Sequence, residues 1–204
     1  MTIPHREPHE PSSFRKASKD ALLLVLRPLI RWLSVMRVRP DTLTVVGWTL
    51  ALGAAVLFSL GYARVAGLVM LLGGLFDALD GAVARESNRM SSFGAFLDST
   101  LDRLSESAVF VGLMFFYAGA ARPNAALLAG VAMTFSLLTS YARARAEGLD
   151  INCEVGLLER AGRIVILSLL SIAGLPTVGL ALVAAGALVT TAQRILHVRR
   201  ATRE

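Results

Sequence analysis

The sequence predicts an all-α integral membrane protein, with six transmembrane helices preceded by an N-terminal amphipathic interfacial helix. Two observations lead to this fold class. Of the 204 residues, 54% are hydrophobic and the mean hydropathy is +0.59, whereas soluble domains average about 45–50% apolar residues. The hydrophobic residues also gather in runs close to the roughly 20 residues that a spanning helix needs.

Six hydrophobic runs are candidate spans, at residues 42–62, 65–83, 93–118, 125–141, 164–175 and 178–195. The run at 164–175 is short, so we expect residues 155–162 to extend this helix with a polar cytoplasmic end. Asp41 follows Pro40 directly and is the expected N-cap of the first span, because a short carboxylate accepts hydrogen bonds from the free N–H groups of a first helical turn.

The N-terminal region divides into two parts. Residues 1–18 contain three prolines and mixed charges, as expected of a mobile tail. Residues 19–39 combine an apolar face with basic residues and Trp32, which is typical of an amphipathic helix in the membrane interface. This helix could also pack over the cytoplasmic ends of the spans, and Pro28 should kink or divide it. Residues 40–204 then form one six-helix domain.

The distribution of positive charge predicts the topology. Of 21 Lys and Arg residues, only Arg64 and Arg122 fall in the loops after the first and third spans. The positive-inside rule places both termini on the cytoplasmic side of the cell's inner membrane. The net charge of +6 suits contact with anionic membrane lipids. Nucleic acid is not an expected partner, because the basic residues are dispersed at helix ends without interleaved aromatics.

Four aspartates in one short stretch are the strongest indication of function. Asp77 and Asp80 are three residues apart and Asp98 and Asp102 are four apart, so each pair lies on one helical face. A carboxylate at the centre of an apolar helix costs about 2.5 kcal/mol or more, so four of them need a partner. Hard oxygen ligands without a nearby His or Cys favour Mg²⁺, Mn²⁺ or Ca²⁺ over zinc.

Salt bridges to Arg85 or Arg103 are the alternative to a metal, but two positive charges cannot neutralise four carboxylates. Gly81 and Gly94 have no side chain and Ala84 has only a methyl group, so a bulky phosphorylated ligand could approach the backbone there. Arg85 would place a guanidinium there for a phosphate oxygen. These residues together indicate phosphoryl transfer, in which two cations a few ångströms apart could polarise a diphosphate.

The same residues carry a family resemblance. The string Asp77-x₂-Asp80-Gly81-x₂-Ala84-Arg85-x₈-Gly94-x₃-Asp98-x₃-Asp102 resembles the complete signature of the CDP-alcohol phosphotransferases. The six-span layout and the amphipathic N-terminal helix are similar to that family as well. The resemblance implies an enzyme that transfers a substituted phosphate from a CDP-linked donor, usually CDP-diacylglycerol, to an alcohol and releases CMP.

The resemblance also implies roles for individual residues. Asp77, Asp80 and Asp98 would hold divalent metals, expected to be two Mg²⁺ or Mn²⁺ ions. Asp102 would be the base that deprotonates the acceptor hydroxyl while remaining close to the metals. The residues that would line the nucleotide site are Gly81, Ala84, Arg85 and Gly94. A homodimer is the expected assembly.

Three further segments, residues 140–147, 159–163 and 193–194, resemble the basic pocket of the actinobacterial phosphatidylinositol phosphate synthases. Their arginines, Arg143, Arg160, Arg163 and Arg194, come from the cytoplasmic ends of three spans and could converge on a dianionic phosphate. Arg143 stands where a lysine is expected, so the charge is kept while the geometry differs. Each arginine could instead be an ordinary helix-end charge. The expected acceptor is inositol phosphate, and the expected product is phosphatidylinositol phosphate.

Two other functions remain open from the sequence. Glycerol 3-phosphate also carries a phosphate, and its use would make the protein a phosphatidylglycerol phosphate synthase. A cation transporter could line its pathway with intramembrane carboxylates, but its polar residues should then be spread along the spans. Here they collect at one depth beside an arginine.

Overall fold

A computed structural model of the chain describes residues 13–87 and 90–203, and within these ranges it is α-helical without a strand. Residues 1–12 of the expected tail lie outside the described residues. The helices are α1 (Ser13–Val35), α2 (Pro40–Ser59), α3 (Ala63–Glu86), α4 (Ser92–Gly119), α5 (Pro123–Glu147), α6 (Arg160–Ile172) and α7 (Pro176–Ala201).

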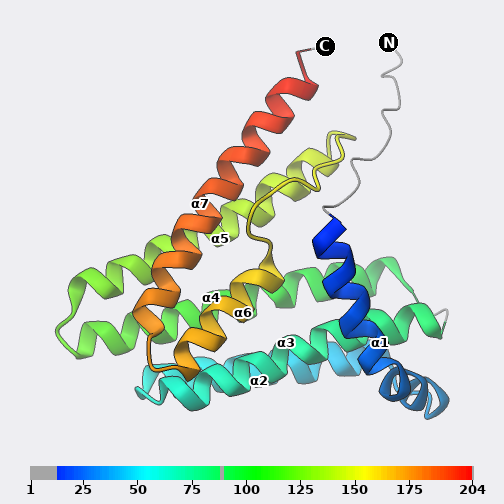
Figure 1. The fold of residues 1–204 in the computed structure, drawn as a ribbon, viewed down its shortest axis with the longest axis horizontal. Coiled ribbons are helices and arrows are strands. Elements are labelled where there is room, and N and C mark those ends of the chain that lie inside the picture. The colour runs from blue at the N-terminus through cyan, green and yellow to red at the C-terminus, as the bar shows by residue number, and fades with distance from the viewer. Residues whose placement is uncertain (1–12, 88–89, 204) are drawn as a thin grey trace.

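Helices α2 to α7 form successive hairpins (Figure 1). The three tight turns between α2 and α3, α4 and α5, and α6 and α7 lie at one end of the bundle, which we call the turn end. Toward the other end, the polar end, lie α1, the end of α3, the start of α4, the α5–α6 connection and the end of α7. Helix α2 packs on α3 and α4, α5 packs on α4 and α7, and α6 packs on α3 and α7.

The turns at the turn end share one geometry. Each contains a residue in the left-handed region: Gly61 (φ 85°), Ala121 (φ 53°) and Gly174 (φ 82°). In each turn the N–H of the following residue donates to the carbonyl five residues earlier, over 2.7 to 2.9 Å. This Schellman-type ending satisfies free helix carbonyls and reverses the chain within a few residues. The proline at the start of α5 and of α7 then begins the next helix.

Two apolar clusters hold the bundle together. The larger one joins α2 to α7 around buried residues that include Phe58, Phe110, Leu113, Leu167 and Leu180. Close helix contacts at small residues support it: a Cβ on Gly67 of α3 would lie 2.7 Å from the carbonyl oxygen of Ser168 on α6. The smaller cluster lies at the polar end, where α1 packs on α3.

Helix α1 differs from its expected bounds. It begins at Ser13, six residues earlier than expected, ends at Val35, and continues through Pro28 without being divided. Ile30 and Leu33 are buried in the smaller cluster, so α1 does pack over this end of the bundle. Trp32, by contrast, is 56% exposed.

Four helices, α2, α3, α5 and α7, are long and apolar enough to cross a membrane. Helix α4 has 28 residues but carries the charged residues of the expected site. Helix α6 has only 13 residues, and the expectation that residues 155–162 extend it as a helix is wrong for 155–159. The chain is thus a multi-pass helical membrane protein.

Two local features explain where α6 and α2 begin. Gly156 has φ 147°, and the next two backbone N–H groups donate to Gln193 (2.7 Å) and Thr190 (2.8 Å) on α7, so these groups are bound to α7 instead of to helix carbonyls. Asp41 is not the N-cap of α2: Arg39 holds that position, with Pro40 at the first helical position, where the fixed φ of proline suits a helix start.

Candidate active site

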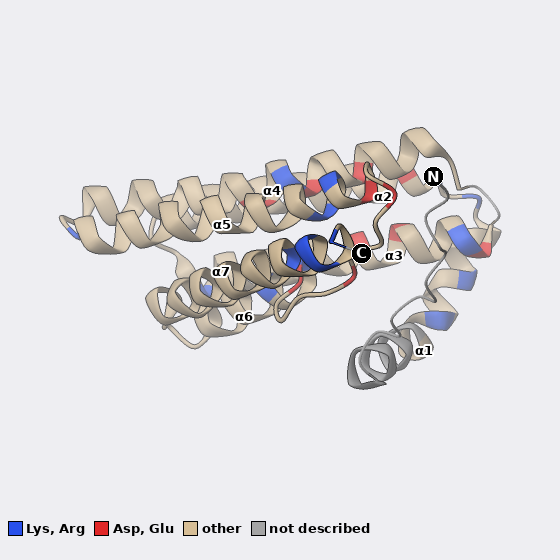
Figure 2. Ribbon diagram, turned by 90° about the horizontal axis from the view of Figure 1, so that it is seen from above, with Lys and Arg blue, Asp and Glu red and all other residues tan. Residues whose placement is uncertain are grey.

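The charged residues gather in the half of the bundle toward the polar end (Figure 2). Asp77 and Asp80 extend from α3, and Asp98 and Asp102 from α4. Asp77 and Asp98 are each close enough to Asp80 and to Asp102 to repel them. The structure therefore brings together the four aspartates that the sequence predicted.

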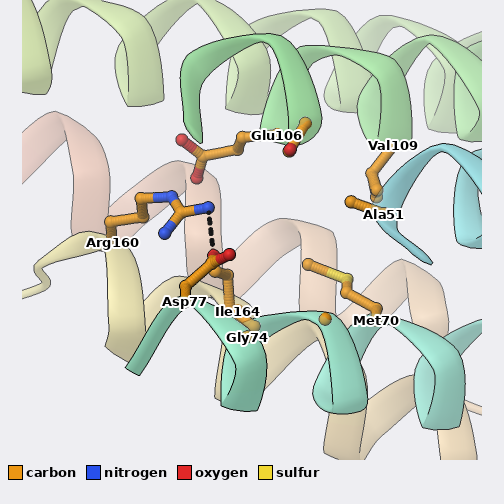
Figure 3. Close-up of a pocket in the computed structure, with 10 residues that line it drawn as sticks. Ala51, Met70, Gly74, Asp77, Glu106, Val109, Arg160 and Ile164 are labelled. Carbon is orange, nitrogen blue, oxygen red and sulfur yellow. Dashed lines mark hydrogen bonds and ion pairs between the residues drawn. The ribbon is translucent and has the colours of Figure 1, made fainter. Parts of the chain in front are cut away.

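Arg160 joins the two acidic helices. Its Nη2 lies 2.9 Å from Oδ2 of Asp77 and 2.9 Å from Oδ1 of Asp102. Arg160 and Asp77 contact each other directly and both line a small cavity (Figure 3). Arg160 is the first residue of α6, after Glu159 in an extended conformation, and α6 packs on α3. This packing delivers the arginine to carboxylates more than 50 residues away in the chain.

A threonine that sequence analysis did not assign completes the surroundings of Asp80. Thr44 on α2 donates its hydroxyl hydrogen to Oδ2 of Asp80 over 2.6 Å, and Asp80 is only 5% exposed. One turn further along α2, a Cβ on Gly47 would lie 2.5 Å from Oδ1 of Asp77. Helix α2 therefore approaches the aspartates at a place where only glycine leaves room for Asp77.

The small residues of the signature lie around the same cluster. A Cβ on Gly81 would lie 3.4 Å from Nη1 of Arg85, so the exposed Arg85 side chain folds back over this glycine. Ala84 is partly buried on the same helix. Gly94 donates its N–H to Oγ of Ser91, the N-cap of α4.

Two of the expected phosphate-binding arginines are buried and already engaged. Arg163 is 2% exposed, and its Nε and Nη2 donate to the two carboxylate oxygens of Glu106 over 2.7 and 2.9 Å. Arg194 is 3% exposed and donates to the backbone carbonyls of Val155 (2.9 Å) and Thr139 (2.6 Å). Sequence analysis missed Glu106, although it lies one turn beyond Asp102 on the same face.

Arg143 lies at the surface, where its Nε is 2.7 Å from Oε1 of Glu147. Arg143 and Arg163 are both near enough to Arg194 to repel it, so these three arginines form one basic region. Arg160 is set apart from them by its contacts with the aspartates. The four arginines reach the same end of the bundle, but they do not meet at a single point.

The carboxylate oxygens of the aspartates are suitable ligands for a divalent cation. Among the described residues, no three His, Cys, Asp or Glu side chains are grouped in a ready-made metal site, because Asp77 and Asp102 contact Arg160 and Asp80 contacts Thr44. The set still offers carboxylate oxygens from two helices, which are the ligands that Mg²⁺ and Mn²⁺ prefer.

Known proteins share both sequence and fold with this chain. The sequence model of the CDP-alcohol phosphatidyltransferase family matches residues 37–194. A phosphatidylinositol phosphate synthase of Mycobacterium tuberculosis is 34% identical over 189 residues, which cover 87% of each protein. An archaetidylinositol phosphate synthase of Methanothermobacter thermautotrophicus is 38% identical over 161 residues, covering 76% of this chain and 80% of the relative.

Solved structures of one of these relatives share the fold of this chain. The crystal structure of the M. tuberculosis phosphatidylinositol phosphate synthase with CDP-DAG bound superposes with a TM-score of 0.76 at 32% identity, over 84% of this chain and 92% of that one. The complex of the same protein with manganese and citrate gives 0.75 at 33% identity, over 84% and 87% of the two chains. The chain belongs to the CDP-alcohol phosphatidyltransferase family, and its fold is that of this class of membrane enzyme.

Proposed function

We propose that the protein transfers a phosphatidyl group from CDP-diacylglycerol to a hydroxyl of inositol phosphate, releasing CMP and forming phosphatidylinositol phosphate. The observation that carries this proposal is the contact of Arg160 with Asp77 and Asp102, because it puts a phosphate-binding group beside the carboxylates of the family signature. The names of bacterial and archaeal relatives, which differ in the lipid and agree on inositol phosphate, support the same acceptor.

The aspartates form the donor side of the proposed site. We assign Asp77, Asp80, Asp98 and Asp102 to the binding of Mg²⁺ or Mn²⁺, with two ions as the expected number, and the manganese complex of the M. tuberculosis relative supports a divalent cation. Bound cations would polarise the diphosphate of the donor and stabilise the leaving CMP. On α2, Gly47 leaves room for Asp77, and Thr44 donates a hydrogen bond to Asp80.

Asp102 is the proposed general base. Its carboxylate accepts the proton of the acceptor hydroxyl, whose oxygen forms a bond to the phosphorus attached to diacylglycerol. The bond between this phosphorus and the bridging oxygen breaks, and CMP leaves with that oxygen. Asp77 of α3 and Asp102 of α4 both contact Arg160, so the proposed base lies beside the proposed acceptor side.

The nucleotide of the donor is assigned to the signature residues between the acidic pairs. Gly81, Ala84 and Gly94 leave the backbone of α3 and of the start of α4 approachable. Arg85 lies exposed over Gly81, where its guanidinium can contact a donor phosphate.

Arg143, Arg160 and Arg194 form the proposed acceptor side. A phosphorylated polyol brings two negative charges, which suit guanidinium groups on the same side of the site, whereas serine or free inositol would not need them. Arg160 would hold the acceptor phosphate nearest the base, with Arg143 and Arg194 farther from the aspartates. Arg163 was expected in this pocket too. Its Nε and Nη2 already donate hydrogen bonds to Glu106, so we leave Arg163 out of the phosphate contacts.

The membrane placement follows from the charges. We propose that α4 and α6 cross the cell membrane together with the four apolar helices, and that both termini and the site face the cytoplasm. Among the Lys and Arg of the described residues, only Arg64 and Arg122 lie near the turn end, in agreement with the positive-inside rule. The exposed Trp32 and its neighbours on α1 would lie in the lipid interface. A homodimer remains part of the proposal.

The test is CMP release by the purified protein in detergent with CDP-diacylglycerol and Mg²⁺. Four acceptors are compared: inositol 1-phosphate, inositol, glycerol 3-phosphate and serine. We expect release with inositol 1-phosphate alone. Preference for glycerol 3-phosphate would instead identify a phosphatidylglycerol phosphate synthase with the same site. No CMP release with any of the four acceptors, combined with cation flux in vesicles, would favour the cation transporter.

A further inference from the structure

The chain between α5 and α6 is bound along one face of α7. Gln193, Arg194 and His197 follow Thr190 by three, four and seven residues, so the four side chains share one side of the helix. Each of them forms a hydrogen bond with the backbone of residues 152–158, which we call the α5–α6 segment. Four polar side chains of one helix face therefore hold a segment that is not itself helical.

Two backbone N–H groups near the end of the α5–α6 segment donate to α7. That of Leu157 donates to Oε1 of Gln193 over 2.7 Å, and that of Leu158 donates to Oγ1 of Thr190 over 2.8 Å. Thr190 is fully buried. Loss of its hydroxyl would leave the N–H of Leu158 without this acceptor, and an unsatisfied donor in a part-buried place weakens the contact between the segment and α7.

Gly156 lets the α5–α6 segment approach α7 closely. Its φ of 147° is one that residues with a side chain rarely adopt. A Cβ at this position would clash with Cγ2 of Thr190 and would lie 3.6 Å from Nε of Arg194. The backbone at Gly156 therefore lies directly against these two side chains, at a place where a larger residue would force the segment away.

The same approach places the carbonyl of Val155 on Arg194. Nε of Arg194 donates to this carbonyl over 2.9 Å, and Nη1 donates to the carbonyl of Thr139 on α5 over 2.6 Å. Two acceptors on different parts of the chain fix the orientation of the planar guanidinium. Because these contacts use Nε and Nη1, Nη2 is the nitrogen that would reach the acceptor phosphate.

We propose that three residues, Gly156, Thr190 and Gln193, position the α5–α6 segment on α7 for acceptor binding. They contact neither substrate and act through Arg194, because the segment that they hold carries the carbonyl of Val155, which orients the guanidinium. The inference rests on the proposed function in one respect, the assignment of Arg194 to the acceptor side.

The experiment measures CMP release with CDP-diacylglycerol and inositol 1-phosphate in Thr190→Val, Arg194→Gln and the double variant. Thr190→Val keeps the shape of the side chain without its hydroxyl, so the KM for inositol 1-phosphate should rise about three- to tenfold as Arg194 loses its fixed orientation. The KM for the donor should stay unchanged. In the Arg194→Gln background the substitution should have no further effect on the acceptor KM. Additive effects would overturn a role through Arg194.

Thr134→Val is the matched control. Thr134 is exposed on α5, and its hydroxyl donates to the carbonyl four residues earlier, as that of Thr190 also does. The control loses the same bond within a helix and should leave both KM values unchanged. If Thr190→Val does not fold, Gln193→Leu removes the other acceptor at an exposed position, and a smaller rise in the acceptor KM is expected. Loss of folded protein alone lowers the apparent kcat and raises neither KM.

Hydrogen exchange of the backbone amides in detergent, followed by mass spectrometry, gives a readout that does not depend on activity. Thr190→Val should speed the exchange of residues 157–158 by about tenfold, whereas Thr134→Val should not. Faster exchange with an unchanged acceptor KM would overturn the positioning role, and unchanged exchange would overturn the part assigned to Thr190 in holding the segment.

The wild-type assay separates this inference from the proposed function. Wild-type protein that uses glycerol 3-phosphate in place of inositol 1-phosphate would overturn the proposed acceptor alone. The same cycle measured with glycerol 3-phosphate then decides the positioning role, because both acceptors carry a phosphate. Wild-type protein that uses neither acceptor would overturn both.

Discussion

Helices α2 to α4 and helices α5 to α7 bring opposite charges to one site by different means. The carboxylates of α3 and α4 come from one stretch of 26 residues, at the helical spacings of the signature. The arginines come from α5, α6 and α7, and the buried ones on α6 and α7 have partners distant in sequence, as in the contact between Arg163 and Glu106. We call α2 to α4 the acidic half and α5 to α7 the basic half. The site residues of the acidic half can thus be recognised from their spacing alone, whereas those of the basic half depend on how the helices pack.

Removal of divalent cations should have the largest effect, and it tests the acidic half. Dialysis against EDTA should abolish CMP release, because the donor diphosphate then lacks its counter-charge. Adding Mg²⁺ or Mn²⁺ back should restore it, and the concentration dependence of recovery can be followed in the same assay. Full activity after exhaustive chelation would remove the aspartates as metal ligands.

Asp102→Asn should separate chemistry from binding within the acidic half. Loss of a general base lowers kcat by about 10²–10⁴-fold, while the binding of CDP-diacylglycerol should largely survive. CMP release and donor binding by the purified variant are the two measurements. The matched control is Asp150→Asn, at an exposed loop position, which should behave as wild type. Comparable activity of the two variants would rule out Asp102 as the base.

Gly47→Ala should show how tightly α2 supports the acidic half. The new Cβ would lie 2.5 Å from Oδ1 of Asp77 and 3.2 Å from the carbonyl oxygen of Gly73, and overpacking of this kind costs about 1–3 kcal/mol. Both thermal stability in detergent and CMP release should fall.

Gly53→Ala on the same helix is the matched control. No atom lies within 4 Å of its Cβ position, and alanine favours a helix over glycine by up to about 1 kcal/mol. Stability should stay equal or rise. Equal losses of thermal stability and CMP release in the two variants would mean that the close approach of α2 to Asp77 does not determine the activity of the site.

Arg143→Gln should give the smallest effect, and it concerns the basic half. Its ion pair with Glu147 lies at the surface, where such contacts contribute about 0.2–1 kcal/mol. The KM for inositol 1-phosphate should rise about two- to fivefold, and thermal stability should stay constant. A rise confined to the KM of the donor would place Arg143 outside the acceptor side.

The contrast between the halves also explains what the sequence could predict. The aspartates, Gly81 and Gly94 were identifiable because helical periodicity relates residues within one stretch. Hydropathy located α2, α3, α5 and α7 for the same local reason. The start of α6 was not predictable, because the backbone N–H groups of Leu157 and Leu158 donate to side chains of α7, which is distant in sequence. Thr44 and Glu106 were missed because their partners lie on other helices.

The most direct test of the central claim compares two acceptors in two proteins. The ratio of kcat/KM for inositol 1-phosphate to that for inositol is measured in wild type and in Arg160→Gln. If the basic half recognises the acceptor phosphate, wild type should strongly favour inositol 1-phosphate and Arg160→Gln should bring the ratio close to one. An Arg160→Gln variant that loses activity with both acceptors equally, leaving the ratio unchanged, would contradict the account.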